Sequence, residues 1–87
     1  MKERFPTLKN TEVVLSRADV NTGIVLAEDF KYASNSTYKV FTIFDNASMA
    51  LEAAEKIVAE NPLVECYIYK AFDKLLYFLN STGKKEF

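Results

Sequence analysis

The chain has 87 residues, of which 49% are hydrophobic and 14% aromatic. This size and composition predict one small folded domain and exclude the polar, charge-rich class of disordered proteins. A net charge of -1, from 11 basic and 12 acidic residues, gives no field that would attract nucleic acid or an anionic membrane. We expect a single domain over residues 1–87, with loosely ordered tails at 1–10 and 81–87.

Residues 12–17 (EVVLSR) and 24–32 (IVLAEDFKY) are rich in β-branched side chains, and a turn-forming segment at 21–23 separates them. They predict a first hairpin. Residues 38–44 (YKVFTIF) form the clearest strand pattern, since they are β-branched and aromatic and contain no Gly or Pro.

The hydrophobic period then changes from two to about 3.6 residues, which predicts a helix. Asp45 or Asn46 can cap its first turn, and Asn61 and Pro62 end it, because proline cannot continue the hydrogen-bond ladder. Its apolar stripe consists of Ala47, Ala50, Leu51, Ala54, Ile57 and Val58.

Residues 63–70 alternate between two faces, 71–74 predict a turn, and 75–80 a returning strand. The alternative for 73–80 is a short helix. The strand–helix–strand order predicts a crossover with 38–44 and 63–70 parallel. The fold class is therefore α+β: one helix packed on a sheet of roughly five strands, mixed or antiparallel, in the order β-β-β-α-β-β.

One helix is about 10 Å wide, whereas five strands span about 24 Å, so one sheet face lacks helical cover. The last hairpin is apolar or aromatic on both faces. An even-numbered turn places Leu76 and Phe78 beside Tyr67 and Tyr69, and an odd one exchanges the two sets. The candidate interface residues are Tyr38, Val40, Tyr67, Tyr69, Leu76 and Phe78. Such a face is covered by another protein, most simply a second copy, or by the chain's own ends with Phe5, Leu8 and Phe87. The remaining alternative is that it stays exposed, because tyrosine hydroxyls make a partly hydrated sheet surface acceptable.

The residues that carry chemistry are few. The chain has no histidine, and Cys66 stands at an apolar strand position, which is typical of a packed thiol. The carboxylate pairs Glu28/Asp29 and Glu52/Glu55 are typical of solvated surfaces. We therefore expect no enzyme activity, no cofactor and no metal site.

The location of the protein is predicted from three absences. The first ten residues lack a signal-peptide apolar core, and no apolar run approaches the roughly 20 residues of a membrane-spanning helix. Cys66 is the single cysteine, so an intrachain disulfide is impossible. These features predict a cytoplasmic protein.

The leading functional hypothesis is a non-catalytic protein-association domain that forms a homodimer through its aromatic sheet face. The alternative is a small bacterial inhibitor or immunity-type protein that binds a basic partner through Glu52, Glu55 and Glu60 on the helix. A third hypothesis, a dimeric ferredoxin-like enzyme or ligand carrier, requires a polar pocket between helix and sheet. The alanine-rich helix stripe favours tight packing instead.

Overall fold

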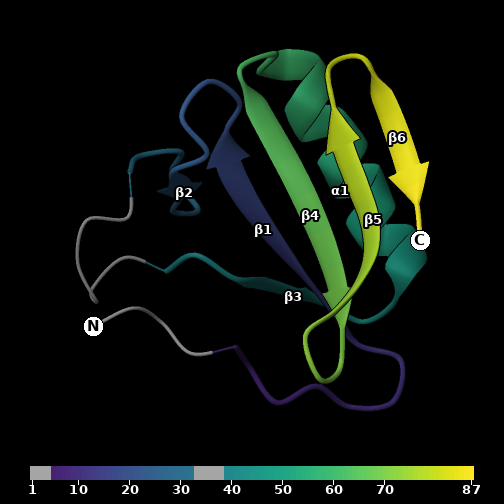
Figure 1. Ribbon diagram of the computed structural model, residues 1–87. Coiled ribbons are helices and arrows are strands. Elements are labelled where there is room, and N and C mark those ends of the chain that lie inside the picture. Colours follow the sequence, from purple (N-terminus) through teal and green to yellow (C-terminus); the bar gives the residue numbers. More distant parts are fainter. Residues whose placement is uncertain (1–4, 33–38) are drawn as a thin grey trace.

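The computed structural model describes residues 5–32 and 39–87, in which one helix packs on one face of a six-stranded antiparallel sheet (Figure 1). The strands pair in the order β2-β1-β4-β5-β6, and β3 also pairs with β1. The elements are β1 (Val13–Asp19), β2 (Val25–Leu26), β3 (Thr42–Phe44), α1 (Ala47–Glu60), β4 (Val64–Lys70), β5 (Lys74–Asn80) and β6 (Gly83–Glu86). The α+β class and the order β-β-β-α-β-β are confirmed, with β6 added at the end.

Helix α1 begins and ends where the capping residues predict. The Asn46 side chain accepts a hydrogen bond from the Met49 backbone N–H at 2.9 Å. At the other end, the backbone N–H of Asn61 donates to the Ile57 carbonyl at 2.8 Å. Between the caps, Ala50 and Ala54 are fully buried, so the small side chains let the helix lie close to the sheet.

The predicted crossover is only partly correct. β3 and β4 run in the same direction, but they are not neighbours, because both are antiparallel to β1, which lies between them. Strand β1 suits this central position, since Val13, Val14 and Leu15 are all buried and occupy both of its faces. The strands predicted at 24–32 and 38–44 are also shorter in the structure, where only β2 and β3 form ladders.

The C-terminal residues differ from the expected loose tail. Residues 83–86 form β6, which pairs with β5 from Asn80 opposite Gly83 to Tyr77 opposite Glu86. This pairing occupies an edge of β5 that a five-stranded sheet would leave open.

The molecule is a flat slab with extents of 32 × 32 × 18 Å. Its core lies between α1 and the sheet, and consists of Val13, Leu15, Ala50, Ala54, Val58, Cys66, Ile68 and Leu79. In Figure 1, α1 lies behind β4 and β5, and the opposite face of these strands is turned toward the viewer. We call that opposite face the ring face.

Candidate protein-association surface

A turn and a bulge together decide which side chains of β5 reach the ring face. Lys70 pairs with Lys74, so the β4–β5 turn contains the three residues 71–73, an odd number. The register then shifts by one between Ile68 and Tyr69, opposite Leu76, and beyond this bulge Tyr67 pairs with Phe78. The bulge thus cancels the effect of the odd turn, and Phe78 lies on the same face as Tyr67.

Five aromatic rings form a continuous row on the ring face. Tyr67 stacks on Tyr69, with ring centroids 6.4 Å apart, and lies 5.1 Å from Phe78. Phe5 extends the row through edge contacts to Tyr69 at 6.0 Å and to Phe41 at 5.7 Å. Aromatic pairs at such distances contribute roughly 0.5–1.5 kcal/mol each beyond their buried area. The rings therefore hold one another in fixed positions.

The structure brings together three of the six predicted interface residues: Tyr67, Tyr69 and Phe78, all half-buried. Two others do not lie on this surface. Val40 is only 8% exposed, and Leu76 packs against the core beneath α1, because it is the extra residue of the bulge. The sixth, Tyr38, lies outside the described residues.

The chain's own ends cover part of the ring face, as the second interpretation of the sequence expected. Phe5 lies against Tyr69 and Phe41, and Val14 beneath this region is fully buried. Phe87 covers less, since it is 60% exposed, with the Lys85 ammonium 5.3 Å from its ring centroid. The cover is therefore partial, and it is concentrated at the Tyr69 end.

Two further exposed apolar residues belong to this face, and sequence reasoning missed both. Val25 pairs with Ala18, and Ile43 pairs with Val14, which places their side chains on the ring face. They are 39% and 46% exposed. The alternation of β2 and β3 does not say which face is buried; that depends on their pairing with β1, which the sequence does not reveal.

The phenol groups of the ring face are protonated at neutral pH. Burial raises the pKa of Tyr67 to about 12, and the hydrogen bond from its hydroxyl to Glu65, 2.8 Å long, acts in the same direction. Burial also raises the pKa of Tyr69, with a smaller contribution from the charge of Asp73. The row is therefore an uncharged surface that still carries hydroxyl groups.

A buried arginine organises the opposite side of the sheet. Arg17 is 3% exposed, and its Nη2 donates to the Thr42 hydroxyl at 2.6 Å. The Thr42 hydroxyl donates in turn to Glu28 Oε2, also at 2.6 Å. This chain of contacts ties β1 to β3 and to the segment after β2, so Glu28 is a structural partner here.

Cys66 is a core residue. It is fully buried, and burial is the main reason why the pKa of its thiol is raised to about 11; the charge of Arg17 opposes this shift, and the charge of Glu65 adds a smaller increase. A thiol with this pKa is a poor nucleophile at neutral pH. Glu52, Glu55 and Glu60 are exposed on α1. Across residues 5–32 and 39–87, no three acidic or cysteine side chains converge in a way that could hold a metal ion.

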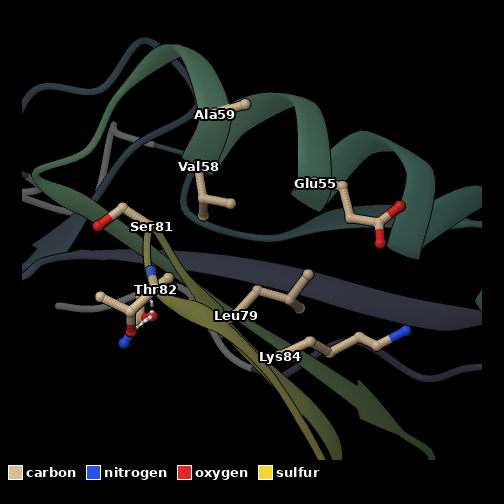
Figure 2. Close-up of a pocket in the computed structure, with 9 residues that line it drawn as sticks. Glu55, Val58, Ala59, Leu79, Ser81, Thr82 and Lys84 are labelled. Carbon is tan, nitrogen blue, oxygen red and sulfur yellow. Dashed lines mark hydrogen bonds between the residues drawn. The ribbon is translucent and has the colours of Figure 1, made fainter.

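An open groove of about 330 Å³ lies between α1 and the β5–β6 hairpin (Figure 2). Val58 and Ala59 line it from the helix, and Leu79 lines it from β5. Figure 2 shows Glu55 above this groove and the Lys84 side chain extending along its lower wall. The groove is therefore at the margin of the helix–sheet interface, whereas the space beneath the middle of α1 is filled by the core.

The sequence matches no protein-family model, and no significant match was found among curated proteins or solved structures. Within the part of the chain that the structure describes, no helix has the length and apolar character needed to cross a bilayer. Any functional conclusion must therefore come from the geometry of the surface itself.

Proposed function

We propose that the protein is a non-catalytic association domain, which forms a homodimer by packing the ring face of one copy against the ring face of another. The observation that carries the proposal is the continuous aromatic row with the exposed side chains of Val25 and Ile43 on the same face. Contiguous apolar surface of this kind is uncommon on soluble monomers and typical of interaction sites. Tyrosine is also favoured at protein interfaces.

The dimensions of the face suit a dimer. The broad side of the slab measures 32 × 32 Å, and a standard interface buries about 800 Å² on each partner. The accessible surface is 5773 Å², whereas a compact monomer of 9.9 kDa is expected to expose about 5200 Å². Association through the ring face would remove part of this surface from solvent.

A second copy is the simplest partner, because the surface can complement itself. A two-fold dimer places the same patch on both sides of the interface. The ring face carries one acidic residue beside the rings, Glu65, and one basic residue opposite Phe78, Lys85. Two copies therefore present both signs of charge to each other around a neutral aromatic centre.

The proposal includes the absence of catalysis and a cytoplasmic location. Cys66, the single cysteine of the chain, is a buried free thiol. It is thus withdrawn both from nucleophilic chemistry and from disulfide formation with another molecule.

Sedimentation velocity over a concentration series tests the dimer. We expect the wild-type chain to self-associate at micromolar concentration, and the variant Tyr67→Lys/Tyr69→Lys to sediment at a lower mass than the wild type, because it places ammonium groups in the centre of the face and removes the contact between ring faces. Phe72→Lys is the matched control: it removes an aromatic side chain that is 99% exposed at the β4–β5 turn. We expect this control to keep the mass of the wild type.

A second variant tests the same surface with less risk of unfolding the monomer. Val25→Lys/Ile43→Lys changes side chains that are already exposed, so the monomer should tolerate it, as circular dichroism will show. We expect it to weaken the same contact. A wild-type chain that remains monomeric at high concentration, or an assembly whose mass neither double variant lowers, would falsify the proposal.

A further inference from the structure

Strand β6 ends the strand order of the described sheet, and its outer edge carries backbone groups that point away from β5. The Phe87 N–H donates to the Leu76 carbonyl at 2.9 Å. In an antiparallel ladder, residues that bond to the neighbouring strand alternate with residues that do not. Gly83 and Lys85 therefore direct their N–H and C=O groups toward β5, as Phe87 does, whereas Lys84 and Glu86 direct theirs outward.

We propose that this outer edge pairs with β6 of a second copy to form one continuous antiparallel sheet. A two-fold axis perpendicular to the sheet keeps each side chain on its own face and allows only a few registers. One of them uses the outward groups of both residues in both copies: Lys84 opposite Glu86 of the second copy, and Glu86 opposite its Lys84. In this register each such pair exchanges two backbone hydrogen bonds.

The side chains favour the same register. Each copy then contributes a lysine to one cross-strand pair and a glutamate to the other, so two pairs of opposite charge form on the face that α1 covers. Figure 2 shows that the Lys84 side chain lies along the open groove, where it can turn toward the added strand. Backbone pattern and charge pattern thus identify a second copy as the occupant of this edge.

One contact opposes the pairing. Lys85 lies opposite Lys85 of the second copy on the two-fold axis, and like charges in this position repel. Within each copy the Lys85 ammonium lies over the ring of Phe87, at 5.3 Å, and this cation–π contact does not remove its charge. Lysine on an edge strand usually discourages pairing with other chains. Here the same edge also carries Glu86, two residues after Lys84. It therefore favours a partner strand with the complementary charges, such as β6 of a second copy.

Charge exchange tests the register. The experiment uses the Tyr67→Lys/Tyr69→Lys chain, in which the ring face is blocked, so this proposal does not rest on the first one. We expect that chain to form a dimer through β6, whereas the wild-type chain, which has both contacts, assembles beyond a dimer. Lys84→Glu places glutamate opposite Glu86, and Glu86→Lys places lysine opposite Lys84, so each should weaken the dimer by about tenfold or more. The combination Lys84→Glu/Glu86→Lys restores opposite charges and should restore the dimer.

Two helix variants serve as controls, since Lys56→Glu and Glu60→Lys make the same charge changes on the exposed side of α1. We expect neither to change the mass. Lys85→Ala should tighten the dimer, because it removes the repulsive pair. If the ring-face variant does not fold, the Val25→Lys/Ile43→Lys chain replaces it. A ring-blocked chain that is strictly monomeric, or a double exchange that stays as weak as the single ones, overturns the edge pairing and leaves the ring-face proposal untouched.

Discussion

Replacement of Thr42 by valine tests whether the contact between Arg17 and Thr42 holds β3 in place. The Thr42 hydroxyl accepts from Arg17 at 2.6 Å and donates to Glu28 at 2.6 Å, so one oxygen links three segments of the chain. Valine has nearly the same shape and an equally strong preference for strands. The substitution therefore removes the hydroxyl group and leaves the packing of β3 largely unchanged.

The structure sets the size of the effect. A hydrogen bond to a charged group contributes roughly 1.5–3 kcal/mol to stability. The Leu15 and Val40 carbonyls also accept from the same Arg17 nitrogen, but at 3.5 Å these hydrogen bonds are long, and they replace the short bond to the hydroxyl poorly. We expect the free energy of unfolding to fall by about 2 kcal/mol, which corresponds to a decrease of roughly 8–16 °C in Tm for a domain of this size.

Urea denaturation followed by circular dichroism measures this change. Thr42→Ser keeps a hydroxyl and should retain most of the stability, and Thr11→Val, at an exposed position, is the matched control. Since Cys66 and the rest of the core are unchanged, the m-value should stay constant. A Thr42→Val variant within about 0.5 kcal/mol of the wild type, the range of ordinary surface substitutions, would show that the hydroxyl contributes nothing to the attachment of β3.

The remaining predictions concern the helix cap and the alkaline limit of stability. Asn46→Ala removes the acceptor of the Met49 N–H and should lower the free energy of unfolding by about 1 kcal/mol, whereas Asn46→Asp should not; equal stability of the two would contradict the cap. The pKa of Cys66 is raised from 9.0 to about 11 in the folded protein, so its contribution to stability is present in full below about pH 9 and is lost as the pH rises toward 11. We expect Cys66→Ala to lose less stability than the wild type over this range in denaturation at stepped pH, and identical slopes would refute a buried, protonated thiol.

The sequence predicts α1 well, because the signals are local. Asn46, Asn61 and Pro62 mark its ends within a few residues of the chain, and the apolar stripe marks the buried side. The β4–β5 hairpin is predicted for the same reason. In each case, the residues that determine the element are also its nearest neighbours in sequence.

The strands that sequence analysis misses depend on contacts between distant segments. The residues of β6, GKKE, carry no apolar pattern, and they form a strand because β5 offers an open edge after a tight turn. The position of β3 beside β1 likewise follows from pairing between residues about 27 positions apart in the chain, for example Leu15 with Thr42. Such pairings depend on how all the strands of the sheet pack together, and no local segment of the sequence determines them.

The ring face was predicted in part for the same reason. Alternation along β4 places Tyr67 and Tyr69 on one face, and this much is local. Which residues of β5 lie on the same face as these two tyrosines depends on the length of the turn and on the bulge. The bulge cannot be predicted from the sequence. Phe78 lies on the same face as Tyr67, whereas Leu76 packs against the core.

The bulge at Leu76 also affects which deletions the β4–β5 hairpin tolerates. In most hairpins, losing one codon from the turn reverses the orientation of every later residue of the strand. Here a deletion within 71–73 can be absorbed if the strand straightens and Leu76 takes a regular position, so that Tyr77 to Asn80 keep their present partners. The length of the 71–73 turn is thus less constrained than the distribution of residues 77–80 between the two faces of the sheet.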